Sequence, residues 1–403
     1  MKKNISICAL CLVFTSCTQN EKVTGTMFKD DIAFLQKHTD VIVLTDENEN
    51  AQIAVIPGMQ GRIMTSTANG ADGLSFGWIN RELIESGENN KHMNAFGGED
   101  RFWLGPEGGQ FSIFFKKGDP FDLEHWWTPE PVNEGGYDII EQGRDHIHFH
   151  KKMQLENYSG TQFDLELDRR VRLLSEERVA DIFGCDFSDV QFVAFASENT
   201  ITNIGEQTWR KETGLLSIWI LGMYNPSPAT TIVIPFRAGS EESLGAKVND
   251  AYFGKVPKER LVVGDSVLFF SGDGEYRSKI GLSPQRAKSV LGSYDATNHV
   301  LTLVTLNKPD DTFDYVNSMW EIQEKPFEGD VVNSYNDGPP APGAKPLGPF
   351  YELETSSPAA GLAPGGSLQH IHTTIHIQGE KERLNDITVE LLGVTLKEIR
   401  QAI

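Results

Sequence analysis

The sequence predicts an all-β fold, a large antiparallel β-sandwich with minor helices near both ends. Runs of β-branched and aromatic residues recur along most of the 403-residue chain, divided by turns rich in Asp, Asn and Gly. Several runs are about nine residues or longer, which suits a large twisted sandwich better than a small barrel. Because no long helical patterns alternate with these runs, a doubly wound α/β fold is disfavoured.

Two helices and a series of strands are expected in order along the chain. The apolar spacing of Phe28, Ile32 and Leu35 predicts a short helix over Met27–His38, and Thr395 precedes a second helical pattern at the C-terminus. The expected strands are Val41–Leu44, Ile53–Ile56, Phe111–Phe115, Ile147–Leu155, Asp164–Leu173, Gln191–Asn203, Gly214–Gly222, Thr231–Phe236, Leu261–Phe270, Val300–Leu306 and Leu368–Ile377.

The N-terminus has the pattern of a secretory signal. Lys2 and Lys3 precede an apolar stretch that is too short to span a bilayer, and Phe14-Thr15-Ser16-Cys17 resembles a bacterial lipobox. We therefore expect a signal peptide over residues 1–16, a lipid on Cys17, a polar tether over 17–25 and a single domain over 26–403. The protein would be exported and anchored to a bacterial membrane by this lipid only, facing the periplasm or the cell exterior. A plain secretory signal with an incidental Cys17 is the alternative.

Composition describes an ordinary globular protein with an acidic surface. The formal net charge is −21, which makes a nucleic-acid partner unfavourable because such a surface repels phosphate backbones. Of the four cysteines, Cys8 and Cys11 lie in the expected signal and Cys17 would carry the lipid. Cys185 is then left alone, so neither an intramolecular disulfide nor a cysteine hydrolase is expected.

The segment around Glu354 carries the strongest functional pattern. Leu353-Glu354-Thr355 is followed by Pro358 and then by Leu362-Ala363-Pro364-Gly365. This order resembles the late strands of the galactose mutarotase (aldose 1-epimerase) superfamily, in an uncharacterised bacterial lipoprotein branch. The resemblance implies a β-supersandwich of the galactose mutarotase type, with Glu354 as the catalytic base. The Pro- and Gly-rich segment Asp337–Pro349, just before this motif, is expected to be a functional loop.

Three earlier segments resemble the same family in the same order. Pro57–Ile63 is similar to its opening strand and turn, and Asn80-Arg81 is similar to the pair whose arginine reaches the sugar. His92–Asp100 is similar to its His-Leu-His-Gly-Gly segment, which implies that His92 lies near the substrate. The family's central acid histidine has no counterpart here, because neither Thr200–Asn203 nor Leu216–Trp219 contains a histidine. The standard mutarotase mechanism, which needs both an acid and a base, is therefore not implied.

Two groups of alternating histidines and one pair of glutamates add further candidates. On a strand, Glu352 and Glu354 project from one face, where they could pair with Arg62 or Arg81 or form a solvated rim. The histidines occupy alternate positions of two expected strands, and they could line a ligand cleft, lie on a plain surface or, least favoured, bind a metal. They are His146, His148 and His150 on one strand and His370, His372 and His376 on the other.

Aromatic residues gather in two segments that are expected to be loops, Arg101–Gly109 and His125–Pro129. Indole rings such as those of Trp103 and Trp126 pack on the C–H face of a pyranose, and neighbouring charged groups such as Asp100 bind its hydroxyls. The alternative is that these tryptophans only plug the ends of the sandwich.

Together these features predict a carbohydrate-recognising exported lipoprotein, acting in an epimerase-like way at an anomeric carbon. Glu354 would be the base, and His92, His370 or His372 the proton donor. The expected ligand-binding residues are Arg62, Arg81, Asp100, Trp103, Trp126, Glu352, His370 and His372. No cofactor is expected, and the oligomeric state is left open. The alternatives are a non-catalytic glycan-binding protein and a polysaccharide lyase or hydrolase, and an excess of Arg and Lys in the cleft would favour the lyase.

Overall fold

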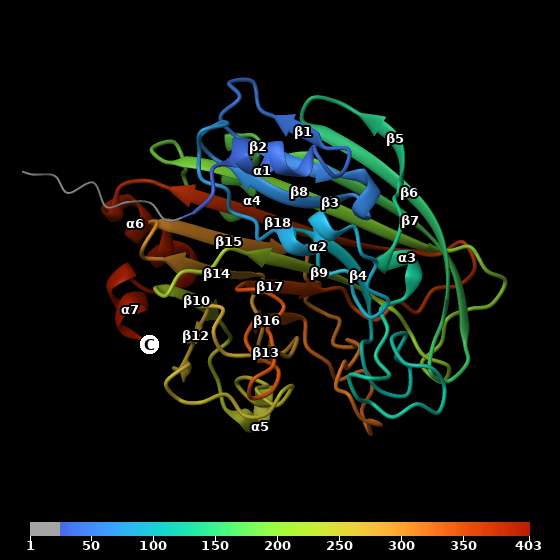
Figure 1. Ribbon diagram of the computed structural model, residues 1–403. Coiled ribbons are helices and arrows are strands. Elements are labelled where there is room, and N and C mark those ends of the chain that lie inside the picture. Colours follow the sequence, from blue (N-terminus) through green and yellow to red (C-terminus); the bar gives the residue numbers. More distant parts are fainter. Residues whose placement is uncertain (1–24) are drawn as a thin grey trace, which may run out of the picture.

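The computed structural model describes residues 25–403, and it contains three antiparallel sheets (Figure 1). The large sheet has ten strands in the order β11 (Leu261–Val263), β12 (Val267–Ser271), β10 (Thr230–Pro235), β14 (Val290–Asp295), β15 (Val300–Leu306), β18 (Ser367–Gln378), β8 (Gln191–Asn203), β7 (Gln162–Leu173), β6 (His146–Glu156) and β5 (Asp138–Gln142). The small sheet has five, in the order β13 (Ser278–Leu282), β16 (Val332–Asn336), β17 (Tyr351–Ser356), β9 (Ser217–Tyr224) and β4 (Arg101–Gly105). The N-terminal sheet consists of β1 (Ile42–Thr45), β2 (Gln52–Ile56) and β3 (Arg62–Thr67). The predicted all-β antiparallel class is confirmed.

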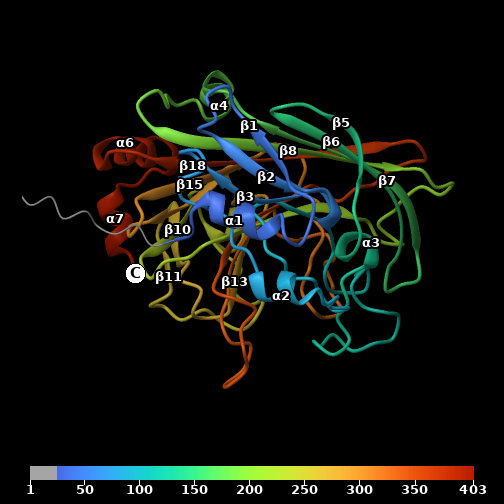
Figure 2. The ribbon, with the colours of Figure 1, turned by 45° about the horizontal axis from the view of Figure 1, so that its top comes forward.

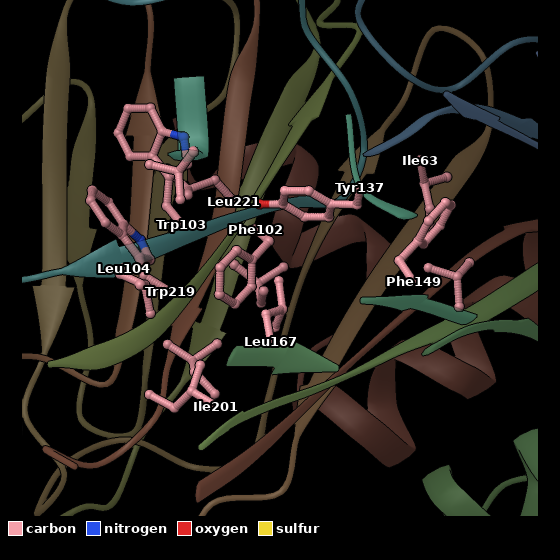
Figure 3. Close-up of a cluster of buried hydrophobic side chains, with 14 of the residues drawn as sticks. Ile63, Phe102, Trp103, Leu104, Tyr137, Phe149, Leu167, Ile201, Trp219 and Leu221 are labelled. Carbon is pink, nitrogen blue, oxygen red and sulfur yellow. The ribbon is translucent and has the colours of Figure 1, made fainter. Parts of the chain in front are cut away.

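The two smaller sheets pack on the inner face of the large sheet. The N-terminal sheet lies against β7 and β8, as Figures 1 and 2 show. The apolar side chains that alternate along β7 and β8, including Leu167 and Ile201, form one buried cluster with Phe102 and Leu221 of the small sheet. Figure 3 shows Phe102 facing Leu167, while the Trp103 and Trp219 indoles lie together apart from them. This burial is the main apolar stabilisation of the sandwich.

Two C-terminal helices pack on the outer face of the large sheet, over β10 and β14. Helices α6 (Lys381–Leu392) and α7 (Leu396–Gln401) bury Leu384, Ile387 and Ile399 against outward-facing residues of the large sheet such as Ile375 and Leu301. Thr395 caps α7 in a capping box with Glu398, as its position before the helical pattern predicted. The predicted N-terminal helix is α1 (Phe28–Leu35). The other helices are short: α2 (Arg81–Ser86), α3 (Glu130–Asn133), α4 (Glu176–Phe183), α5 (Glu241–Leu244) and a 3₁₀ turn at Pro57–Met59.

Several predicted elements are corrected by the structure. Phe111–Phe115 is not a strand but a series of turns and bends, from which Phe114 and Phe115 are buried in the main core. Leu261–Phe270 is not one strand, because Asp265 and Ser266 form the turn of a hairpin between β11 and β12. Arg101–Gly105 was expected to be a loop and is strand β4, which pairs with β9. Helix α6 and strands such as β5 and β13 were not predicted.

No helix within residues 25–403 has the length and apolar character needed to cross a membrane. The predicted signal peptide and lipidated Cys17 lie outside the described residues. Cys185 is buried, and burial together with the nearby Glu390 carboxylate raises the pKa of its thiol to about 12.

Candidate functional site

One face of the small sheet gathers most of the polar groups that could carry chemistry. Residues that pair directly across an antiparallel sheet project from the same face, so the strand register shows which side chains share this face. One cross-strand row runs Lys279, Tyr335, Glu352 and Met223; the next runs Asn333, Glu354, Leu221 and Arg101; and Trp219 pairs with Trp103 beyond them.

A cleft of about 300 Å³ opens over these rows. Four tryptophans line it, namely Trp103, Trp126, Trp219 and Trp320. Its charged lining residues include Arg101, Glu107, Arg277, Lys279, Asp337 and Glu352. The predicted loop at residues 337–349 forms part of one wall, because Pro340, Lys345 and Leu347 also line the cleft.

A larger groove of about 930 Å³ lies on the outer face of the large sheet, around His146 and His148. It contains no aromatic ring other than these imidazoles. We regard the smaller cleft as a better site than this groove, because four indole rings and buried charged groups meet in it.

The tryptophans of the cleft pack on one another. The ring centroids of Trp103 and Trp219 are 5.5 Å apart in an edge-on arrangement, and those of Trp126 and Trp320 are 6.0 Å apart and stacked. Trp103, Trp126 and Trp219 are each less than 10% exposed. They therefore plug the end of the sandwich and, at the same time, present a rigid aromatic surface to the cleft.

Glu354 lies directly behind this surface and is fully buried. Its Oε2 accepts hydrogen bonds from Nε1 of Trp219 at 2.8 Å and from Nζ of Lys279 at 2.9 Å. Its Oε1 has no hydrogen-bond partner among residues 25–403. The predicted base is thus in place on β17, but it is paired with Lys279 rather than with Arg62 or Arg81 and does not itself line the cleft.

Glu352 projects from the same face, as predicted, and does line the cleft. Burial and the adjacent Glu354 charge raise the pKa of its carboxyl to about 8, so Glu352 is largely protonated at neutral pH. Burial lowers the pKa of Lys279, but the carboxylates of Glu354, Glu107 and Glu352 outweigh it and leave this pKa above its usual value. The two neighbouring glutamates therefore have different surroundings, one beside an ammonium and one in a site that favours its neutral form.

Two arginines complete the cleft. The Arg101 guanidinium lies 4.2 Å from the centroid of the Trp103 ring, and its Nη2 is 3.4 Å from Oε1 of Glu352. Burial lowers the pKa of Arg101. The Arg277 guanidinium lies 3.7 Å from the centroid of Phe253.

Of the other predicted site residues, His92 lies next to the cleft and three lie outside it. The Nδ1 of His92 is 2.6 Å from the carbonyl oxygen of Trp126, and its ring stacks on Trp127. Arg81 forms an ion pair with Asp31 instead of reaching the cleft. Arg62 and Asp100 are buried in the core, where Arg62 donates to the carbonyl oxygen of Gly97 and Asp100 pairs with Arg169.

His370 and His372 face the interior between the large and small sheets, behind the cleft. Each has a ring nitrogen 2.8 Å from Oγ1 of Thr355, which projects from β17 on the side opposite Glu354. Burial lowers the pKa of His370 to about 3 and that of His372 to about 4, so both are neutral at ordinary pH. Their predicted role as proton donors to a sugar is therefore corrected, because neither faces the cleft.

The two histidine groups lie on opposite faces of the large sheet. His376 points inward, with its Nε2 2.9 Å from Oε2 of Glu99, whereas His146, His148 and His150 point outward. The outer group pairs with carboxylates; for example, Nε2 of His148 is 2.9 Å from Oδ1 of Asp168. The two groups cannot share a metal, and residues 25–403 contain no cluster of three or more metal-binding side chains.

Sequence reasoning missed several residues of the cleft, namely Lys279, Trp219, Trp320, Glu107 and Arg277. Lys279 offered one signal, since it is a charge inside the apolar alternation of Ser278–Leu282. Trp219 lies in the segment where an acid histidine was sought and found missing, and it donates to Glu354 instead. Arg101 stood beside Trp103 in the sequence but was not selected.

Comparisons with known proteins agree with this architecture. A family described as "Family of unknown function (DUF6786)" matches residues 26–403. No protein of curated function matches the sequence. A protein from Escherichia coli K12, described as a candidate aldose 1-epimerase, has a similar structure with a TM-score of 0.51 and 11% identity, over 85% of this chain and 99% of that one. A galactose mutarotase-like protein from Lactobacillus casei ATCC 334 gives a TM-score of 0.46 and 9% identity, over 84% of this chain and 100% of that one. The similarity to the Escherichia coli protein, at 11% identity, establishes a shared fold alone.

Proposed function

Because the chain belongs to a family of unknown function and has the galactose mutarotase-like fold, we propose that it is a carbohydrate-binding protein whose ligand occupies the Trp-lined cleft. The observation that carries this proposal is the meeting of four tryptophans with Arg101, Lys279 and Glu352 on one face of the small sheet. Indole faces pack on the C–H face of a pyranose, while charged groups bind its hydroxyls. The volume of about 300 Å³ suits one or two sugar rings.

Calorimetric titration with a panel of neutral and acidic monosaccharides and disaccharides would test the proposal. Trp320→Ala removes a partly exposed ring of the cleft, and Trp127→Ala removes a partly exposed ring that does not line it. Saturable binding that is lost in Trp320→Ala and kept in Trp127→Ala would support the cleft as the site. Binding that is unchanged in Trp320→Ala, or absent for every sugar, would contradict it.

A second candidate function is epimerisation at the anomeric carbon, in which a base takes the proton of the anomeric hydroxyl and an acid gives a proton to the ring oxygen as the ring opens. The contrast between the two glutamates favours it, because Glu354 sits beside Lys279 as a base, and Glu352, with its raised pKa, can donate a proton at neutral pH. The acid in this scheme is Glu352, which replaces the missing histidine. Glu354 could reach a sugar only if the Lys279 and Trp219 side chains move aside, since it is fully buried.

The catalytic and non-catalytic functions differ in one measurable rate. If the protein is catalytic, it accelerates α/β equilibration of the bound sugar, followed by polarimetry, and both Glu354→Gln and Glu352→Gln lose this acceleration while remaining folded by circular dichroism. If it only binds, the sugar equilibrates at its uncatalysed rate in the presence of saturating protein.

We also propose that the protein is exported and lipid-anchored through Cys17, on the pattern of residues 1–17. Mass spectrometry of the membrane-extracted full chain would detect a lipid on an N-terminal Cys17. Cys17→Ser should leave this mass absent and release the protein from the membrane fraction, and an unchanged distribution would contradict the proposal.

A further inference from the structure

Arg277 presents an unused guanidinium to the cleft. It forms no hydrogen bond and no ion pair with any side chain or backbone group of residues 25–403, and its contact is the stacking on Phe253. Stacking holds the plane of a guanidinium while leaving its N–H edges available. An arginine held in this way can accept a planar anion without first giving up another partner.

The Arg101 guanidinium also lacks good hydrogen-bond acceptors, although its side chain is only 3% exposed. Its Nε has no partner within residues 25–403, and its Nη1 faces the sulfur of Met93 at 3.8 Å. Its Nη2 is 3.4 Å from Glu352, longer than the roughly 2.7–2.9 Å of a good charge-assisted hydrogen bond. Leaving a buried guanidinium in this state costs free energy, which a ligand oxygen would recover.

The carboxyl groups around the cleft do not offset these two cations fully. Burial raises the pKa of Glu352, Glu107 and Asp337 and so disfavours their charged forms, while the Arg277 charge acts in the opposite direction on Glu107 and Asp337. Asp337 already accepts from the Tyr335 hydroxyl at 2.9 Å and from the backbone N–H of Gly348 at 3.0 Å. Glu354 is committed to Lys279. The polar groups of the cleft that are left to bind a ligand are therefore mainly hydrogen-bond donors.

We propose that the sugar bound in this cleft carries a carboxylate, as in a uronic acid, and that Arg277 binds this group with help from Arg101. The inference rests on the proposed carbohydrate function and narrows it to acidic sugars. A carboxylate is planar and accepts two parallel hydrogen bonds, which matches the fork of a guanidinium. Elsewhere the net charge of −21 opposes an anionic ligand, so an acidic sugar would depend on these local donors.

Calorimetric titration of the protein with two matched pairs of probes would test this. Galacturonate is compared with galactose, and glucuronate with glucose, at pH 7 on the wild type, Arg277→Gln and Arg277→Lys. Arg170→Gln is the matched control, because Arg170 is an exposed arginine on the outer face of the large sheet. We expect at least one uronate to bind roughly 10- to 100-fold more tightly than its neutral partner, the factor that a charge-assisted hydrogen bond supplies.

Arg277→Gln should abolish most of this preference, so that the affinity for the uronate falls toward the affinity for its neutral partner. Arg277→Lys should retain part of it, because the charge remains but the planar fork is lost. Arg170→Gln should behave as the wild type. These results together would support the inference.

Other outcomes would overturn it. Equal binding of uronate and neutral sugar, or a preference that persists in Arg277→Gln, would refute the role of Arg277 while leaving carbohydrate binding intact. Tighter binding of galactose 6-phosphate or galactose 6-sulfate than of galacturonate would refute the carboxylate. If no sugar of any kind binds, the proposed function itself fails, and the inference fails with it.

Discussion

Replacing Lys279 by Met should strongly destabilise the protein, because it strands a buried carboxylate. Glu354 is fully buried, the Lys279 side chain is only 7% exposed, and their charged atoms are 2.9 Å apart. Breaking a buried pair by removing one partner costs about 3–5 kcal/mol. Since Trp219 still donates to Oε2 of Glu354, we expect the lower part of this range, about 3 kcal/mol, in the free energy of unfolding.

Equilibrium urea denaturation at pH 7, followed by tryptophan fluorescence and circular dichroism, measures this loss. Lys279→Met/Glu354→Gln should recover most of it, because the double variant leaves no buried charge. Lys345→Met is the matched control; Lys345 pairs with Glu82 at 2.7 Å, but both side chains are more than 70% exposed, so a loss of less than about 1 kcal/mol is expected. The pKa of Lys279 is raised, so its stabilising contribution is complete below its ordinary value of 10.5 and is lost only as the pH rises through the folded-state value.

Two results would refute this reasoning. A loss of less than about 1 kcal/mol in Lys279→Met would mean that the Lys279–Glu354 pair carries little net energy in the folded protein. A double variant no more stable than Lys279→Met would mean that the loss comes from packing of the lysine stem and not from the unpaired carboxylate.

Three further predictions concern the other titratable groups. Because the folded-state pKa of Glu352 is raised to about 8, the contribution of Glu352 to stability is most favourable below about pH 4.5 and is lost as the pH rises to about 8. The free energy of unfolding should therefore decrease more between pH 5 and pH 8 for the wild type than for Glu352→Gln. His370 and His372 have lowered pKa values of about 3 and about 4, so the stability that they confer in neutral form is lost as the pH falls from about 6.5 toward these values. Acid titration of His370→Gln/His372→Gln, followed by circular dichroism, should show a shallower loss over that range, and a slope equal to that of the wild type would contradict the assignment. Cys185, with a pKa of about 12, should resist iodoacetamide at pH 8 in the folded protein and react in urea, as measured by mass spectrometry; rapid labelling of the folded state would contradict its buried position.

The sequence predicts which side chains of a single strand share a face, but it does not predict which strands combine to form the cleft. The period-two alternation of Tyr351–Ser356 correctly placed Glu352 and Glu354 on one face. It could not name the partners of Glu354, because Lys279 lies 75 residues away and meets it only through the sheet order β13-β16-β17. The cleft is thus a product of strand pairing that no local pattern encodes.

The histidines also show that a local pattern predicts which side chains share a face but not what packs against that face. Alternation correctly predicted that His146, His148 and His150 share a face and that His370, His372 and His376 share another. It could not tell which of these faces is solvated, since that depends on which layer packs against each strand. The small sheet covers the inner face of β18, and His370 and His372 are neutral core residues as a result.

Local patterns were enough to predict the all-β class, the terminal helix at Thr395, the loop at residues 337–349 and the chemistry available on β17, because periodicity, capping and turn composition act over a few residues. Strand pairing and packing place Arg81, Arg62 and Asp100 outside the cleft and bring Lys279, Arg101, Arg277 and Trp219 into it. Burial and pairing across the sheets set the surroundings of each charge, and these depend on residues that are distant in the chain. The identity of the charged groups is local information, but their partners, and hence their function, are not.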